Sequence, residues 1–84
     1  MSIPEELKKL IRVGDYTLIA ELYRDRHYLL EDYKTVTSQY VQMVIDGERE
    51  ANPGTAAEEI IEIAIKYLEH KRNFIDELLT VDNS

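Results

Sequence analysis

The apolar residues of this 84-residue chain recur every three or four positions, in stretches separated by glycine, proline and small polar residues. This spacing places side chains on one face of an α-helix. The only β-prone run is 35–37, which is too short to form a strand. The chain is therefore predicted to be all-α, a compact domain of four to five helices with a long C-terminal helix.

The first helix is expected to begin at a capping box made by Ser2 and Glu5, with Pro4 tolerated in the first turn. Gly14 is expected to end it. Its apolar stripe is Leu7, Leu10 and Ile11, and its outer face carries Lys8, Lys9 and Arg12.

A second helix is expected to be capped by Asp15. Its apolar side contains Leu18, Ile19, Leu22 and Tyr23. Ala20 lies next to this stripe and is small enough for another helix to approach closely. We place a break near 26–28, although a single helix running on to about Tyr33 also fits, since no glycine or proline interrupts the segment.

A short amphipathic helix is predicted over about 38–46, with Thr37 as its cap and Gly47 at its end. One face is apolar and contains Val41, Val44 and Ile45. The opposite face contains Gln39, Gln42, Met43 and Asp46.

The last helix is predicted over about 56–79, after a turn-rich loop at 48–55. Thr55 and Glu58 form its capping box. Its apolar stripe is Ala57, Ile60, Ile61, Ala64, Ile65, Leu68, Ile75, Leu78 and Leu79, interrupted by Lys71 and Arg72. The end of the helix, at 71–79, either folds back on the first helix or pairs with a second copy, and 80–84 is a polar tail.

Composition describes one soluble globular domain over 1–84, with 44% hydrophobic and 32% charged residues. The chain lacks cysteine, a long apolar run and a signal-like N-terminus, so we expect a cytoplasmic protein without membrane contact. Its net charge of −7 is unusual for a nucleic-acid-binding domain.

Candidate chemistry is sparse. The histidines, His27 and His70, are far apart in the sequence, and the three glycines stand singly. The pairs 31–32 and 69–70 point to different helix faces. We therefore predict no enzyme activity, no catalytic residues, no metal, no cofactor and no small-molecule substrate.

The segments 18–22 (LIAEL) and 37–49 (TSQYVQMVIDGER) together resemble the paired helices of the lambda-repressor-like helix-turn-helix family. The resemblance covers about residues 5–70. This sequence departs from the family in the dozen extra residues at 23–35, which must form a longer loop or an extended helix.

The resemblance implies a small DNA-binding transcriptional regulator that reads the major groove with the helix Ser38–Asp46. Ser38, Gln39 and Gln42 would face bases, and Met43 would touch a thymine methyl. Thr37 would hold a phosphate at the helix start, flanked by backbone contacts from Lys34 and Arg49. Core positions would be Ile19, Ala20, Leu22, Val41, Val44 and Ile45. Family members commonly bind as dimers, and a homodimer contact through Phe74, Ile75, Leu78 and Leu79 would fit.

The alternative is an acidic helical protein-interaction module without DNA binding, which mimics DNA or binds a regulator. The negative charge favours this alternative. Asp46, Glu48 and Glu50 would repel phosphates at the end of the reading helix. The charges that surround Gln39 and Gln42 in space separate the two hypotheses.

Overall fold

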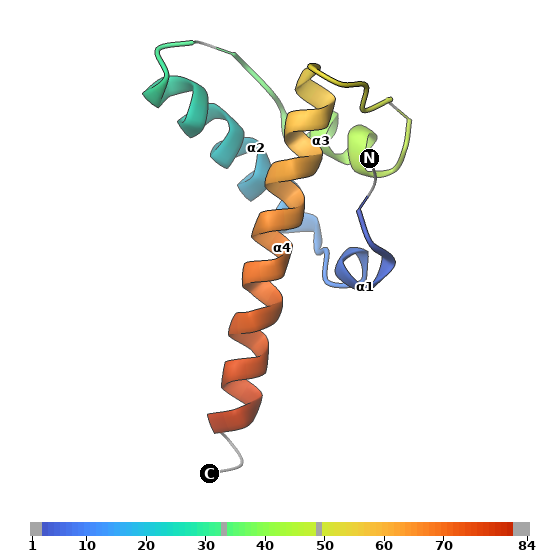
Figure 1. Cartoon of the computed structure of the whole chain (residues 1–84), viewed down its shortest axis with the longest axis vertical. Coiled ribbons are helices and arrows are strands. Elements are labelled where there is room, and N and C mark those ends of the chain that lie inside the picture. Colours follow the sequence, from blue (N-terminus) through green and yellow to red (C-terminus); the bar gives the residue numbers. More distant parts are fainter. Residues whose placement is uncertain (1–2, 33, 49, 82–84) are drawn as a thin grey trace.

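The computed structural model describes residues 3–32, 34–48 and 50–81, which form four α-helices. In chain order these are α1 (Glu5–Lys8), α2 (Val13–Leu29), α3 (Ser38–Ile45) and α4 (Ala56–Val81). Helices α2 and α3 pack around the first half of α4, α1 lies beside its middle, and the C-terminal part of α4 extends beyond them (Figure 1). The prediction of an all-α domain with a long C-terminal helix is confirmed.

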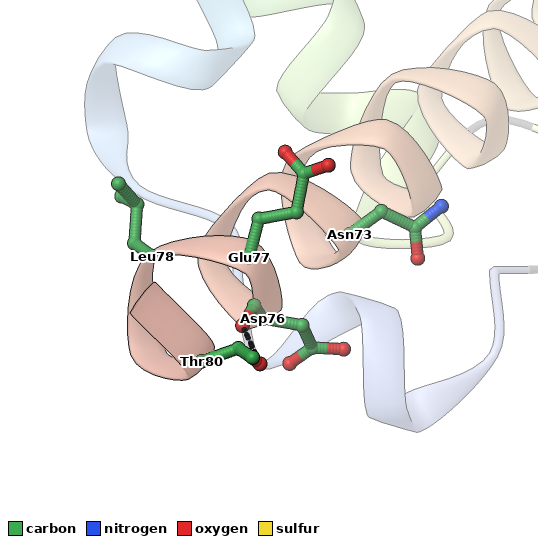
Figure 2. A pocket seen from close by; sticks show the side chains of 5 residues that line it. All are labelled: Asn73, Asp76, Glu77, Leu78 and Thr80. Carbon is green, nitrogen blue, oxygen red and sulfur yellow. Dashed lines mark hydrogen bonds between the residues drawn. The ribbon is translucent and has the colours of Figure 1, made fainter. Parts of the chain in front are cut away.

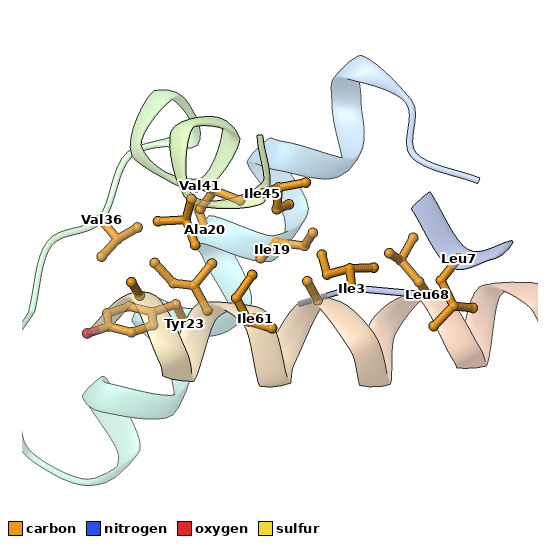
Figure 3. Close-up of a cluster of buried hydrophobic side chains, with 14 residues drawn as sticks. Ile3, Leu7, Ile19, Ala20, Tyr23, Val36, Val41, Ile45, Ile61 and Leu68 are labelled. Atoms are coloured by element: carbon orange, nitrogen blue, oxygen red, sulfur yellow. The ribbon is translucent and has the colours of Figure 1, made fainter. Parts of the chain in front are cut away.

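One apolar core joins the four helices (Figure 3). The back of α3 contributes Val41, Val44 and Ile45, as predicted. Ala20 of α2 is also buried and lies beside Val41, which agrees with the close approach expected of a small residue. The remaining buried apolar side chains are Ile3, Leu7, Ile19, Tyr23, Val36, Ala57, Ile60, Ile61, Ala64 and Leu68.

The start of α2 differs from the sequence prediction. Gly14 does not end the first helix, because α1 stops at Lys8 and Gly14 is the second residue of α2. Asp15 is not the cap. It is the third residue of α2, and its Oδ2 accepts a hydrogen bond of 2.8 Å from the backbone N–H of Arg12, the N-cap residue. An acid at this position satisfies the cap amide from inside the helix. The predicted cap Ser2 lies outside the described residues.

The predicted break near 26–28 is also wrong, since α2 continues through these residues to Leu29. The chain turns out of the helix two residues later, at Glu31, whose φ is 57°. The backbone N–H of Glu31 donates to Tyr28 O, and that of Asp32 donates to His27 O. This pair of bonds is the usual left-handed helix end, made here by a glutamate where glycine is common. A sequence reading based on glycine therefore could not find it.

Leu22 is not a core residue, and neither is Leu18. Their side chains are 43% and 45% exposed, because the buried face of α2 runs through Ile19, Tyr23 and His27. This face is rotated by about one position from the predicted one. The sequence does not define the buried face of α2 clearly, because apolar residues occupy both sides of this helix.

A partly buried polar cluster joins the start of α2 to the middle of α4. Tyr67 donates its hydroxyl hydrogen to Asp15 Oδ1 at 2.6 Å. The Lys71 ammonium donates to Asp15 Oδ2 at 2.6 Å and to the carbonyl oxygen of Leu10 at 2.8 Å. Lys71, which interrupts the apolar stripe in the sequence, therefore has its partner on another helix.

Burial by itself would raise the pKa of Asp15. The hydrogen bonds from Lys71, Tyr67 and the Arg12 amide, together with the charge of Lys71, outweigh burial and lower this pKa below its ordinary value of 3.8. Burial and the bond to Asp15 raise the pKa of Tyr67 to about 12, so this phenol remains a hydrogen-bond donor.

We predict that Asp15→Asn lowers the free energy of unfolding at pH 7 by about 3 kcal/mol, because it leaves Lys71 without its buried counter-charge. A carboxyl whose pKa is lowered on folding stabilises the fold above its unfolded pKa, and this stabilisation is lost as the pH falls through the folded pKa. The difference between wild type and variant should therefore narrow from pH 5 to pH 3. Urea unfolding of wild type and variant, followed by circular dichroism at pH 5 and at pH 3, measures this difference in unfolding free energy.

The matched control is Glu6→Gln, which removes a second ion pair to α4, between Glu6 and Arg72 at 3.4 Å. The Glu6 side chain is 71% exposed, so the change should be less than about 1 kcal/mol and similar at both pH values. A loss in Glu6→Gln as large as that in Asp15→Asn would contradict the role assigned to burial.

A pair of glycine substitutions should change stability in opposite directions. Gly47 has a φ of 86°, so Gly47→Ala is strained and should destabilise the fold by about 1 kcal/mol. Gly14 lies in the first turn of α2, and a Cβ there would meet no atom within 4 Å. Gly14→Ala should therefore stabilise by about 0.5–1 kcal/mol. Thermal unfolding of both variants tests these two expectations. A Gly47→Ala variant that is more stable than wild type would refute the strain assigned to Gly47.

Candidate nucleic-acid interface

Helix α3 begins and ends at the residues that the sequence indicates. The Thr37 hydroxyl accepts a hydrogen bond of 3.2 Å from the backbone N–H of Tyr40. At the other end, the N–H of Gly47 donates to Val44 O and the N–H of Glu48 donates to Met43 O. The left-handed Gly47 thus closes the helix as predicted. Because both ends are fixed and the back is buried, the outward face of α3 has a defined orientation.

The outer face of α3 consists of Ser38, Gln39, Gln42 and Met43. The first three are exposed and Met43 is half-buried. These residues are spaced by three and four positions, which brings them to one side of the helix. Each glutamine offers both a donor and an acceptor, the combination that pairs with the major-groove edge of adenine.

Basic side chains lie near the start of α3. Lys34 is exposed, and its ammonium lies 3.8 Å from Asp32 Oδ2. Lys34 also lines a surface hollow of about 370 Å³ together with Arg24, Asp25, Tyr28 and Thr35. Arg24 and Lys34 are therefore neighbours on this surface. The N-terminus of α3 adds a partial positive charge to the charges of Arg24 and Lys34.

The other end of α3 is acidic. Asp46, which follows the last helical residue, and Glu48 are both exposed. Arg49, predicted to contact the DNA backbone, lies outside the described residues. The end of α3 is therefore acidic, whereas bases and acids lie together near its start, where Asp25 shares the hollow with Arg24 and Asp32 lies beside Lys34. Arg26 does not join the bases near the start of α3, because it lies 3.7 Å from Glu59 of α4.

A second partly buried cluster, centred on His27, holds the segment that leads into α3. His27, only 4% exposed, has its Nε2 at 2.7 Å from Glu59 Oε2 in the first turns of α4. Its Nδ1 lies 3.3 Å from Asp32 Oδ2, just after α2. Its ring also packs on Tyr23, with centroids 4.4 Å apart. The sequence gives no local motif for this cluster, because His27 and Glu59 are 32 residues apart in the chain.

The predicted dimer residues lie on the part of α4 that extends beyond the other helices. Phe74, Leu78 and Leu79 are exposed, and Ile75 is half-buried. Helix α1 leaves Phe74, Leu78 and Leu79 exposed, since Leu7 packs beside Leu68, about two to three turns earlier on α4 (Figure 3).

Another hollow lies along this same part of α4, lined by Asn73, Asp76, Glu77, Leu78 and Thr80. All five residues belong to one helix, and the Thr80 hydroxyl donates to the Asp76 carbonyl oxygen at 2.9 Å (Figure 2). A surface built from a single helix does not enclose a ligand. It is instead the side of a helix open to contact.

Within the described ranges, no three His, Asp or Glu side chains are grouped so that they could hold a metal ion. No helix in the same ranges is long and apolar enough to cross a membrane. Comparisons of the chain with known protein families, with curated proteins and with solved structures found no match.

Proposed function

We propose that this chain is a DNA-binding transcriptional regulator that reads the major groove with α3. The proposal depends on one observation, the exposed row of Ser38, Gln39 and Gln42 on a helix whose back is fully packed. A rigidly held helix with amides facing outward is the arrangement that direct readout of base edges requires.

The proposed contacts divide between the outer face of α3 and the segment at its start. Gln39 and Gln42 would pair with base edges, Ser38 would bond a base or sugar, and Met43 would pack on a thymine methyl. Phosphates would lie at the start of the helix, near Thr37 and Lys34. Arg24, which the sequence resemblance did not include, would join them because it shares a hollow with Lys34.

A homodimer through α4 is part of this proposal. The positions Ala57, Ile61, Ala64, Leu68, Lys71, Ile75 and Leu78 alternate by four and three residues, which is the spacing of a coiled-coil seam. The seam residues from Ala57 to Leu68 are buried within the subunit. Further along α4, the seam residue Ile75 is half-buried and Leu78 is exposed. A second copy of α4 would cover this end and place two α3 helices for two half-sites.

DNA binding is tested with random-sequence duplex at about 50 mM and 200 mM salt. We expect binding that weakens with salt, and Lys34→Gln should weaken it for all sequences and reduce the salt slope by about one. On a selected site, Gln42→Ala should lose about 1–3 kcal/mol of discrimination at one base pair.

The matched control is Asn73→Ala, which removes an exposed amide from α4, far along the chain from α3. It should leave DNA binding unchanged. Absence of wild-type binding at low salt would contradict the DNA-binding proposal itself. Binding that neither Lys34→Gln nor Gln42→Ala alters would contradict the placement of the interface.

The dimer is tested by sedimentation of Leu78→Asp against Leu29→Asp. Both leucines are exposed, at 52% and 80%, but only Leu78 lies on the seam. Leu78→Asp should raise the dimer dissociation constant by about 100-fold, since a central interface side chain contributes about 2–4 kcal/mol. Leu29→Asp should leave it unchanged. If the wild-type protein sediments as a monomer even at a protein concentration on the order of 0.1 mM, the dimer is refuted.

A second candidate function is an acidic module that binds a basic protein partner. It is favoured by the net charge of −7 and by Asp46 and Glu48 at the end of α3. Such a module would bind no duplex DNA even at low salt, so the DNA assay also separates the two candidates.

A further inference from the structure

A small hollow lies where three helices and the segment before α3 meet. Its volume is about 320 Å³, within the range of sites for small organic ligands. It is lined by Tyr23 of α2, Lys34, Thr35 and Val36 of the connecting segment, Tyr40 of α3 and Ala56 of α4. Four separate parts of the chain therefore converge on one cavity, in contrast to the hollow along the end of α4.

The most unusual group in this hollow is the Tyr23 hydroxyl. Tyr23 is fully buried, yet its hydroxyl has no hydrogen-bond partner among the residues that the structure describes. Leaving a buried hydroxyl unpaired costs about 1–3 kcal/mol, so buried polar groups normally have partners. In Figure 3 this hydroxyl lies at the edge of the apolar cluster and points away from the aliphatic side chains.

The hydroxyl is available as a donor. Burial, reinforced by the Glu59 and Asp32 carboxylates, raises the pKa of Tyr23, so the phenol keeps its hydrogen. The ring cannot easily turn to find a partner inside the protein, because it packs against His27 at 4.4 Å between centroids. An acceptor that enters the hollow from outside would supply the missing partner.

Two further features of the hollow favour a negative charge. Lys34 lines it, and the only ion pair described for this ammonium is a 3.8 Å contact with Asp32, in which both side chains are about half exposed. Such a pair is weak and easily exchanged for another anion. Ala56 is the first residue of the 26-residue α4, so the positive end of that helix also borders the hollow.

The Glu59 carboxylate does not occupy this position. Glu59 is held by His27 at 2.7 Å and by Arg26 at 3.7 Å, and it does not line the hollow. The remaining lining is apolar or aromatic, from Val36, Ala56 and the rings of the two tyrosines. A bare inorganic anion would leave these surfaces uncovered.

We propose that this hollow binds a small organic acid, with one carboxylate on a short apolar body. The carboxylate accepts a hydrogen bond from Tyr23 and pairs with Lys34, while the body packs against Val36, Ala56 and the ring of Tyr40. An amine would be repelled by Lys34 and the start of α4. This binding site does not depend on the proposed DNA function.

The test is a titration of the ¹⁵N-labelled full chain with benzoate, with benzamide as the neutral analogue and inorganic phosphate as the bare anion. Benzoate should shift the amide signals of Thr35, Tyr40 and Ala56 and saturate. Benzamide lacks the negative charge and phosphate lacks the apolar body, so each should bind at least about tenfold more weakly than benzoate.

Tyr23→Phe removes the hydroxyl and keeps the ring, so the fold should be retained. It should weaken benzoate binding about tenfold, as should Lys34→Gln. Tyr16→Phe, which changes a half-buried phenol outside the hollow, is the matched control and should bind as wild type does.

Three results would overturn the proposal. The first is no saturation by benzoate up to about 10 mM, the range of very weak binding. The second is tighter binding of phosphate than of benzoate, which would identify an inorganic anion site. The third is benzoate binding that Tyr23→Phe leaves unchanged. Because none of these readouts contains DNA, failure here is distinguishable from failure of the regulator proposal.

Discussion

The apolar stripe of α4 is the constraint on which the rest of the structure depends. Helices α1, α2 and α3 all pack against α4, through buried residues from Ala57 to Leu68. A domain of this size has little apolar surface to bury, and a single-turn helix such as α1 cannot persist without tertiary contacts. The orientation of α3, and with it the outer face proposed to read DNA, is therefore set by packing on α4.

Two partly buried polar clusters fix α2 along α4 in one register. Asp15 bonds Tyr67 and Lys71 near one end of α2, and His27 bonds Glu59 near the other. Asp15 and His27 are 12 residues apart, as are Glu59 and Lys71, so the two antiparallel helices match in length between the clusters. Apolar contacts tolerate small sliding, whereas these directional bonds are lost when the helices shift.

The His27 cluster also links the fold to the proposed functions. Tyr23 and His27 pack on each other, Asp32 follows α2, and Lys34 and Thr35 lead directly into α3. The hollow proposed to bind an organic acid and the start of the proposed DNA-reading helix thus share the same short segment. Arg24 and Lys34 lie close together near the start of α3, where Asp25 and Asp32 adjoin them, whereas the end of α3 is acidic.

The sequence by itself determined the local features. Thr37, Gly47 and the period of Val41, Val44 and Ile45 specify α3 almost residue by residue, since caps and apolar spacing act within one helix. The all-α class and the long last helix follow from the same local signals.

Tertiary structure alone decided the features that depend on distant partners. The sequence placed Leu22 in the core and a break near 26–28, because α2 has apolar residues on both sides and ends at a left-handed Glu31. Which side is buried depends on α3 and α4. Lys71 is 56 residues from its partner Asp15, and Glu59 is 32 residues from its partner His27. The hollow around Tyr23 combines four separate segments. No local pattern encodes such distances, because they arise only when the helices pack.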